Sequence, residues 1–288
     1  MMWQEVFLSS LKPLRQYLKS NPPELDAAIS EAYALNPWFI PEFSRLAIDA
    51  IADHFLDEEK CRQWLKNYTF SNHDPKKVVI IMAGNVPLVG FHDLMCVLAS
   101  GNEVIIKLSD KDSLLTEFIT DAWGRIEPSL LSRISYVSRL EQFDAVIATG
   151  SNNSSRYFEY YFKNQPHILR RNRNGIAVLT GNETREQLKE LAKDIFLYFG
   201  LGCRNVSKIF VPEGYDFSEW GMAIEDWKYL GDHNKYRNNL DYNYAIYIIN
   251  QVTHINLGNT SVCEVLAFII IFSSFMVPGF LHGTLVQM

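Results

Sequence analysis

Short apolar runs alternate with longer amphipathic stretches through the middle of the chain. Residues 78–82 form a continuous apolar run, which is typical of a strand buried inside a parallel sheet. A helix is expected over residues 91–100, and further strands are expected over residues 103–107 and 145–148. Strand, helix and strand in this order predict a doubly wound α/β sheet of the nucleotide-binding type.

The chain before this sheet is expected to be helical. Pro22 and Pro23 separate two helices, and Asn36-Pro37 begins another segment. Four apolar residues share one face at helical spacing and predict a packing surface: Leu25, Ile29, Ala32 and Leu35. We expect these helices to pack against the sheet.

Small polar turns follow the three predicted strands. The first is residues 83–88 and contains Asn85, the second contains Ser109 and Asp110, and the third begins with Thr149-Gly150-Ser151. Such turns place backbone N–H groups and a helix N-terminus where a phosphate can bind. We therefore interpret this region as a candidate nucleotide site.

A cysteine follows a glycine turn later in the chain. An amphipathic helix is predicted over residues 188–199, then Gly200-Leu201-Gly202, Cys203, and a strand over residues 204–212 that ends at a proline. The glycines remove side chains where backbone must approach a substrate carbonyl. The alternative is a small buried cysteine, because free cysteines are often buried.

Composition agrees with a cytoplasmic enzyme. The 288 residues suffice for one large domain or two interlocked ones, and the net charge of −6 argues against a nucleic-acid partner. The four cysteines have neither metal-ligand nor disulfide spacing, and Cys61 and Cys96 are expected to be structural. The N-terminus lacks the apolar run of a secretory signal.

Four segments in order resemble the aldehyde dehydrogenase superfamily and, within it, the acyl-CoA reductases of the LuxC-like, bacterial-bioluminescence fatty acid reductase type. The resemblance extends over residues 78–220. The matching segments are Asn85-Val86-Pro87-Leu88, residues 101–110, Thr149-Gly150-Ser151, and Gly200-Leu201-Gly202-Cys203 with Lys208-Ile209-Phe210-Val211.

This resemblance implies a fold and a site. The expected fold is α/β and aldehyde-dehydrogenase-like, with N-terminal helices and a Rossmann-like cofactor domain over residues 1–175 and an α/β catalytic domain over residues 176–288. Cys203 is the implied nucleophile, and the Asn85 side chain and the Cys203 N–H are the implied oxyanion donors. The implied cofactor-binding residues are Lys107, Ser109, Asp110, Thr149, Gly150 and Ser151.

One departure from the superfamily bears on the reaction. Hydrolytic members have a Glu-Leu-Gly-Gly-Lys segment whose glutamate activates water, whereas residues 170–175 here are Arg-Arg-Asn-Arg-Asn-Gly. Without this base an acyl-enzyme resists hydrolysis, which favours NAD(P)H-dependent reduction of a fatty acyl thioester to an aldehyde. The arginines form either a solvated loop or a surface that steers a phosphate.

Two alternatives to this reaction remain: an aldehyde dehydrogenase working in the oxidative direction, and a silent remnant that binds nucleotide or partners. The resemblance implies acyl-CoA or an acyl-carrier thioester as the substrate. A homo-oligomer is possible, and no metal is expected.

The cofactor prediction favours NADP, with NAD possible. Lys107 suits a ribose hydroxyl or a 2′-phosphate equally. Asp110 stands where an acidic residue would favour NAD, although it can also be an ordinary turn aspartate.

The C-terminal segment differs from the rest of the chain. Residues 265–288 contain no Asp, Glu, Lys or Arg. A membrane anchor is one interpretation, but Pro278-Gly279 interrupts it. We favour a truncated or frame-changed end that begins within residues 251–258, which would leave the catalytic domain incomplete and make activity of this chain doubtful.

Overall fold

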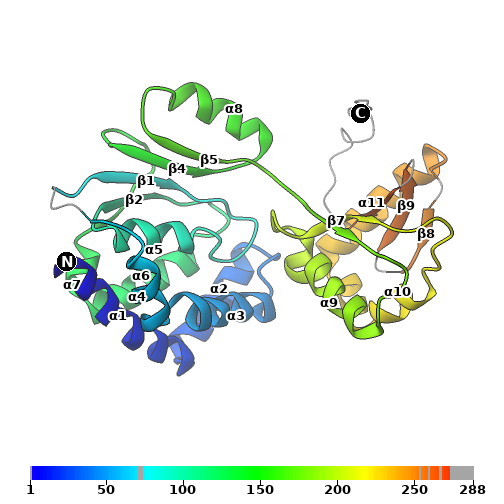
Figure 1. Cartoon of the computed structure of the whole chain (residues 1–288), viewed down its shortest axis with the longest axis horizontal. Coiled ribbons are helices and arrows are strands. Elements are labelled where there is room, and N and C mark those ends of the chain that lie inside the picture. The colour runs from blue at the N-terminus through cyan, green and yellow to red at the C-terminus, as the bar shows by residue number, and fades with distance from the viewer. Residues whose placement is uncertain (1, 71–73, 253, 259, 266–267, 273–288) are drawn as a thin grey trace. The chain divides into compact units, whose positions relative to one another are not determined.

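The computed structural model describes residues 2–70, 74–252, 254–258, 260–265 and 268–272. Contacts divide the chain into two compact units, Met1–Asn172 and Arg173–Met288. Each unit contains its own five-stranded sheet (Figure 1). The predicted α/β class is confirmed.

The sheet of the first unit is entirely parallel, with strand order β3-β2-β1-β4-β5. Its strands are β1 (Lys77–Ile81), β2 (Glu103–Lys107), β3 (Ile134–Tyr136), β4 (Ala145–Thr149) and β5 (His167–Arg170). The chain proceeds outward from β1 to β3 and then returns to the other side of β1 with β4. The order therefore reverses between β1 and β4, which is where ligands bind in open α/β sheets.

Helices cover both faces of this sheet. The connecting helices are α5 (Phe91–Ala99), α6 (Leu114–Ile126), α7 (Pro128–Leu131) and α8 (Asn152–Tyr161). Side chains alternate along β1: Val78 and Ile80 join the large core with α5 and α6, whereas Val79 joins a smaller core with Phe158 and Phe162. Figure 1 shows α5 and α6 on one face and α8 on the other. This two-sided burial explains the continuous apolar run in the sequence.

The N-terminal helices pack against the sheet unit, as the sequence predicts. They are α1 (Met2–Lys19), α2 (Pro23–Leu35), α3 (Pro41–Ala50), a short π-helical segment η1 (Ile51–Phe55) and α4 (Glu58–Leu65). The buried face of α2 contains Leu25, Ile29 and Ala32, but Leu35 is exposed at the last helical residue and lies outside that face.

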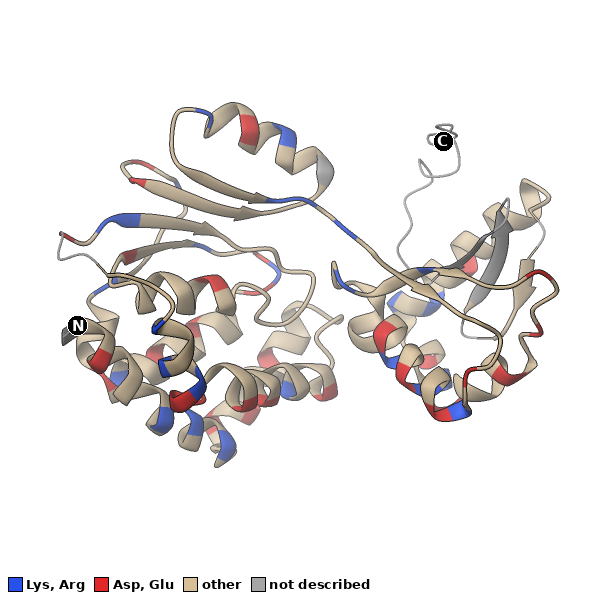
Figure 2. Cartoon of the chain, viewed as in Figure 1, with Lys and Arg blue, Asp and Glu red and all other residues tan. Residues whose placement is uncertain are grey.

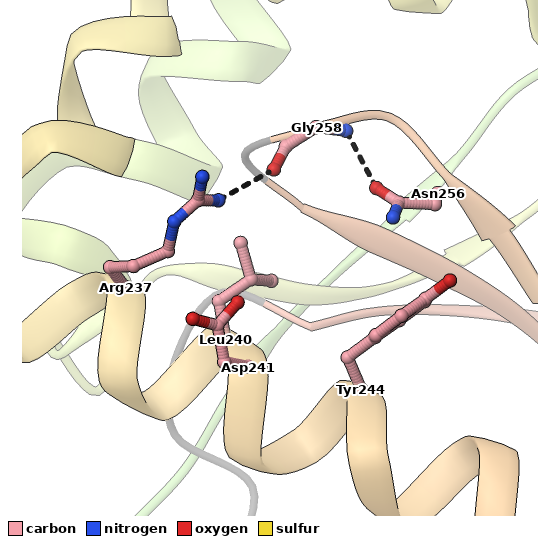
Figure 3. A pocket seen from close by; sticks show the side chains of 6 residues that line it. All are labelled: Arg237, Leu240, Asp241, Tyr244, Asn256 and Gly258. Atoms are coloured by element: carbon pink, nitrogen blue, oxygen red, sulfur yellow. Dashed lines mark hydrogen bonds between the residues drawn. The ribbon is translucent and has the colours of Figure 1, made fainter.

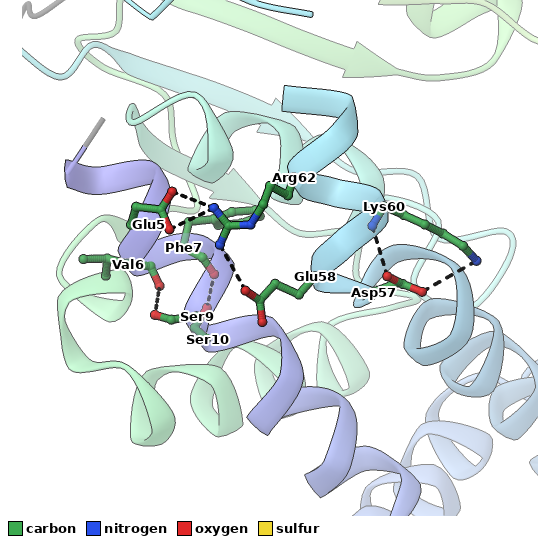
Figure 4. Close-up of polar contacts among 9 residues, drawn as sticks. All are labelled: Glu5, Val6, Phe7, Ser9, Ser10, Asp57, Glu58, Lys60 and Arg62. Carbon is green, nitrogen blue, oxygen red and sulfur yellow. Dashed lines mark hydrogen bonds and ion pairs between the residues drawn. The ribbon is translucent and has the colours of Figure 1, made fainter. Parts of the chain in front are cut away.

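Polar contacts join α1 to α4 (Figure 4). Arg62 donates to both carboxylate oxygens of Glu5 at 2.7 and 3.0 Å and to Glu58 at 3.1 Å. Asp57 caps the start of α4 by accepting from the Lys60 N–H. The Arg62–Glu5 pair connects α4 to α1, whereas the other two contacts lie within α4 and at its start. Charged side chains of both signs are interspersed over the helices of both units (Figure 2).

The second unit contains a mixed sheet with strand order β6-β7-β10-β9-β8, in which β6 and β7 are parallel and the other neighbours are antiparallel. Its strands are β6 (Gly175–Val178), β7 (Val206–Phe210), β8 (His254–Asn256), β9 (Ser261–Val265) and β10 (Phe268–Phe272). Its helices are α9 (Arg185–Phe196), η2 (Leu197–Gly200), α10 (Ser218–Ala223), η3 (Glu225–Asp232) and α11 (Asn234–Ile249).

The predicted bounds of one helix and one strand in this unit are wrong; the helix begins three residues earlier, at Arg185, and the strand ends two residues earlier, at Phe210. Helix α9, which begins with a capping box between Thr184 and Gln187, ends at Phe196 and not at residue 199, because Tyr198 and Phe199 adopt left-handed backbone angles. Strand β7 begins at Val206 and not at residue 204, because the residues around Cys203 form a turn.

Among the described residues, no helix has the length and apolarity needed to cross a membrane. Much of the apolar C-terminal segment, residues 266–267 and 273–288, lies outside the described residues. The predictions for that tail therefore stay predictions.

Candidate functional site

The predicted site residues of the first unit gather at the carboxyl edge of its parallel sheet. Ile81, the last residue of β1, aligns with Lys107 of β2 and Ala148 of β4. The turns after these three strands therefore share one edge. Asn85, Ser109, Asp110, Gly150 and Ser151 lie in these turns, and Lys107 and Thr149 end their strands.

The turn that contains Asn85 has a constrained backbone. Val89 N–H donates to the Val86 carbonyl at 3.3 Å, which closes a β-turn with Pro87 and Leu88 at its centre. Leu88 has φ 58°, a left-handed conformation that such a turn usually assigns to glycine. A non-glycine residue there costs on the order of 1 kcal/mol, so neighbouring contacts must hold it.

Asp112 provides one such contact. Its Oδ2 accepts from the Leu88 N–H at 2.7 Å, and both residues are buried. Burial raises the pKa of Asp112 to about 7, although the hydrogen bond from Leu88 acts in the opposite direction. The sequence pattern does not distinguish Asp112, because an acidic residue in a polar turn is ordinarily exposed.

The turn after β2 packs directly on the turn after β1. A Cβ at Gly84 would lie 2.8 Å from the Ser109 Cβ and 2.9 Å from the Lys111 Cβ, so glycine permits the close approach. Ser109 Oγ accepts from the Lys111 N–H at 3.3 Å, and Asp110 is exposed. The Lys107 ammonium donates to the Ser138 carbonyl at 2.7 Å.

The turn after β4 leads into α8. The Ser151 side chain accepts from the Ser154 N–H at 3.2 Å and caps the helix. A Cβ at Gly150 would collide with Ser154 and Phe158, and the Gly150 N–H donates to the Arg170 carbonyl at 3.2 Å. Gly150 is therefore required here by packing against α8.

Cys203 is exposed on a tight turn in the second unit. The Asn205 N–H donates to the Gly202 carbonyl at 3.1 Å, and the Asn205 Oδ1 accepts from the Gly202 N–H at 2.8 Å. The Asn205 amide nitrogen also donates to the carbonyls of Asp194 and Leu197 at 2.8 and 3.1 Å. One side chain therefore closes the Cys203 turn and satisfies carbonyls at the end of α9.

The backbone before this turn is strained. Tyr198 and Phe199 have φ 54° and 57°, and Gly200 follows with φ 71°. Phe199 is fully buried, with its ring 4.6 Å from that of His233 and 5.7 Å from that of Tyr236. Burial of the Phe199 ring offsets the cost of the left-handed backbone and fixes where the glycine turn begins.

Two of the arginines at residues 170–173 have intramolecular partners. Arg170 donates to Asp93 at 2.7 Å, and Arg171 pairs with Glu159. Burial acts to raise the pKa of Asp93, but hydrogen bonds from His92 and Arg170 outweigh it and the pKa is lowered. Arg170 therefore joins the end of β5 to the first turn of α5 and does not form a merely solvated loop.

The predicted structural role of Cys61 and Cys96 is borne out for one of them. Cys61 is buried, and burial raises the pKa of its thiol to about 11. Cys96 is half-buried and lies 3.7 Å from a ring nitrogen of His92, so it is not a core residue. His92, partly exposed, makes local contacts with Cys96 and Asp93.

The structure brings together the predicted site residues of the first unit, from Asn85 to Ser151. Cys203 belongs to the second unit, and its approach to Asn85 stays a prediction. A separate hollow in the second unit contains none of these residues (Figure 3); it is lined by Arg237, Leu240, Asp241, Tyr244, Asn256 and Gly258. Within it, Asn256 accepts from the Gly258 N–H at 2.8 Å.

Sequence reasoning missed Asp112 and Asn205. Asn205 stands two residues after Cys203, and asparagine is a common turn residue, which is a usable signal. The only signal for Asp112 was its position in the turn that follows β2.

Several solved structures with a similar fold are aldehyde dehydrogenases. Aldehyde dehydrogenase 21 from Physcomitrella patens, in complex with succinate, matches with TM-score 0.62 and 16% identity over 77% of this chain and 52% of its own. A mutant of aldehyde dehydrogenase C from Pseudomonas syringae, in complex with NAD+ and octanal, matches with TM-score 0.58 and 15% identity over 78% and 50%.

A third similar structure is the glyceraldehyde-3-phosphate dehydrogenase GapN from Methanocaldococcus jannaschii, in complex with NADP. It matches with TM-score 0.60 and 15% identity over 78% of this chain and 54% of its own. The chain thus has the aldehyde dehydrogenase fold and spans about half the length of these proteins.

No curated protein matches the sequence significantly. The sequence pattern of a family described as acyl-CoA reductase (LuxC) matches residues 33–224. This range contains Asn85, the turns at the carboxyl edge of the parallel sheet and Cys203. The chain therefore belongs to the acyl-CoA reductase (LuxC) family.

Proposed function

We propose that this protein reduces a fatty acyl thioester, acyl-CoA or acyl-protein, to the aldehyde through an acyl group bound covalently to Cys203. The observation on which the proposal depends is the exposed thiol of Cys203 on a turn closed by Asn205, within the segment that matches the family. An exposed cysteine on a fixed turn can reach a substrate carbonyl, whereas a buried structural cysteine cannot.

The first half-reaction transfers the acyl group. The Cys203 thiolate attacks the thioester carbonyl, and the tetrahedral oxyanion accepts hydrogen bonds from the Asn85 side chain and the Cys203 N–H. When the oxyanion collapses, the bond to the carrier sulfur breaks, the carrier leaves as a thiol after taking a proton, and the acyl group remains on Cys203. Removal of one oxyanion donor typically slows such a step about 100- to 1,000-fold.

The second half-reaction requires a nicotinamide nucleotide, with NADP preferred and NAD possible. The carboxyl edge of the first unit fits such a group: the strand order reverses between β1 and β4, and the turn after β4 opens helix α8. The residues that would hold it are Lys107, Ser109, Asp110, Thr149, Gly150 and Ser151. When bound in its reduced form, the nucleotide supplies a hydride to the acyl carbon.

Release of the aldehyde follows at Cys203. The carbon–sulfur bond breaks as the oxyanion reforms the carbonyl, so Cys203 returns to the thiolate. The segment at residues 170–175 contains no carboxylate, and Arg170 and Arg171 are paired with carboxylates from other segments. The lack of a general base in this segment supports reduction of the acyl group in preference to its hydrolysis.

The test is consumption of NADPH or NADH with a panel of acyl-CoAs of increasing chain length. We expect acyl-CoA-dependent oxidation of the nucleotide, with formation of the matching aldehyde, and its loss in Cys203→Ala. The matched control is Cys96→Ala, which removes a half-buried thiol outside the proposed site and should leave the rate unchanged.

Equal rates in the native chain and in Cys203→Ala would reject the proposed nucleophile. Oxidation of an aldehyde to a free acid with NAD(P)+, without thioester reduction, would favour the oxidative aldehyde dehydrogenase. Nucleotide binding without either reaction would indicate a silent remnant.

A further inference from the structure

We infer that Asp112 is a positioning residue for the Asn85 turn: its buried carboxyl group holds Leu88 in the left-handed conformation that sets the direction of the turn. This inference rests on the proposed function, because it assigns to Asp112 the orientation of an oxyanion donor. Asp112 itself lies on the turn after β2 and contacts the Asn85 turn through the Leu88 backbone.

The contact is a buried hydrogen bond of normal length. The Leu88 N–H donates to Asp112 Oδ2 at 2.7 Å, and Asp112 and Leu88 are 5% and 4% exposed. The second carboxyl oxygen, Oδ1, is buried and has no hydrogen-bond partner among the described residues. Burial of an acid with one unpartnered oxygen lowers the stability of the folded chain. Among the described residues, the hydrogen bond that its side chain makes is the one from the Leu88 N–H, so this contact is the role that the structure indicates for Asp112.

The geometry of Leu88 explains why such a contact is needed. Leucine at φ 58° is strained, and Pro87 immediately before it restricts the turn further. Because Leu88 is buried, its side chain and the bond to Asp112 together hold the conformation. Asn85 lies three residues before Leu88, so a change of the Leu88 backbone redirects the segment that contains the oxyanion donor.

The position of Asp112 is itself fixed by its surroundings. The Asp112 N–H donates to the Ser109 carbonyl at 3.0 Å. The carbonyl of the preceding residue, Lys111, accepts from the Asn36 side chain at 3.2 Å, which ties this turn to the end of α2. Asp112 therefore connects the Asn85 turn to a segment that is itself hydrogen-bonded to the end of α2.

The first measurement is hydrogen exchange at the Leu88 amide in the full chain. We expect Asp112→Ala to reduce the protection of this amide at least about tenfold. Asp112→Asn retains an acceptor oxygen and should preserve most of the protection. Unchanged protection in Asp112→Ala would show that the contact does not hold the turn, and would overturn the inference.

The second measurement is the rate of Cys203 acylation by octanoyl-CoA, followed by intact-protein mass. We expect the limiting rate to fall at least about tenfold in Asp112→Ala while the half-saturating octanoyl-CoA concentration changes less than about twofold, because oxyanion bonds act in the transition state. Asp112→Asn should stay within about threefold of the native rate. Asp121→Asn, an exposed acid on α6, is the matched control.

Asp112→Glu guards against an alanine variant that fails to fold. It keeps the carboxyl group but displaces it by one methylene, and should also slow acylation. If the native chain is acylated and both Asp112→Ala and Asp112→Glu are acylated at the native limiting rate, the positioning role is refuted and the proposed function is not. Failure of the unsubstituted chain to become acylated would refute the proposed function, and the positioning role with it.

Discussion

Two polar side chains, Asp112 and Asn205, hold the two turns on which the proposed chemistry depends. Asp112 binds the Leu88 N–H beside Asn85, and Asn205 binds the Gly202 N–H beside Cys203. In both cases a side chain outside the expected reacting groups fixes the backbone next to one of them. Preorganisation of this kind is effective because small displacements of reacting groups are costly in rate.

The raised pKa of Asp112 makes the stability of the first unit pH-dependent. The folded chain retains the Asp112 proton up to about pH 7, whereas the unfolded chain loses it near 3.8. The native state therefore binds more protons between these values, so this contribution to stability is full below about pH 4 and declines as pH rises to about 7.

Asp112→Asn should remove this decline. We expect the free energy of unfolding of the native chain, relative to Asp112→Asn, to fall by about 2–4 kcal/mol from pH 4 to pH 7. Hydrogen exchange of the β2 amides measures this free energy of unfolding for the first unit alone. A difference that does not change with pH would contradict the raised pKa.

Asn205→Ala should destabilise the second unit more than an ordinary loss of a helix cap. It removes three hydrogen bonds, which are to Gly202, Asp194 and Leu197, and we expect a loss of about 2–3 kcal/mol.

The matched control is Asn250→Ala at the end of α11, which removes one hydrogen bond, to Ile246, and should cost about 0.5–1 kcal/mol. Hydrogen exchange of the β7 amides measures both changes. Equal losses in the two variants would show that Asn205 has no special role.

At the scale of elements, the sequence predicted strands better than the backbone between them. Strand β2 has the predicted bounds, and β1 and β4 differ by one residue, because continuous apolar runs identify buried parallel strands. The predicted end of α9 was wrong because Tyr198 and Phe199 adopt left-handed backbone angles, which their residue types do not favour and the sequence therefore does not predict. The burial of Asp112 could not be predicted either, because it depends on the contact between the turn after β2 and the turn after β1.

The contact between the turns after β1 and β2 is itself testable at Gly84. In Gly84→Ala the new Cβ would meet Ser109 and Lys111, so we expect a loss of about 1–3 kcal/mol and weaker NADPH binding. The control is Gly231→Ala, because a Cβ added at Gly231 would have no atom within 4 Å among the described residues. Thermal unfolding and NADPH titration are the measurements; a Gly84→Ala protein indistinguishable from the native chain would contradict this close packing.

At the scale of the whole molecule, the residues of the proposed reaction come from two α/β units. The first unit gathers Asn85 and the expected cofactor residues at one sheet edge, and the second unit presents Cys203. The family and fold predictions are confirmed by the match over residues 33–224 and by the aldehyde dehydrogenase structures. The proposed approach of Cys203 to Asn85 involves residues of both units, and sequence motifs predict these participants without their geometry.

The most direct test of this account is the mass of the intact protein after incubation with octanoyl-CoA in the absence of nucleotide. We predict one octanoyl group on Cys203, removed by hydroxylamine and released as octanal when NADPH is added, and no such adduct in Cys203→Ala. An adduct of equal yield in Cys203→Ala, or a native chain that stays unmodified, would contradict the assignment of Cys203 as the nucleophile.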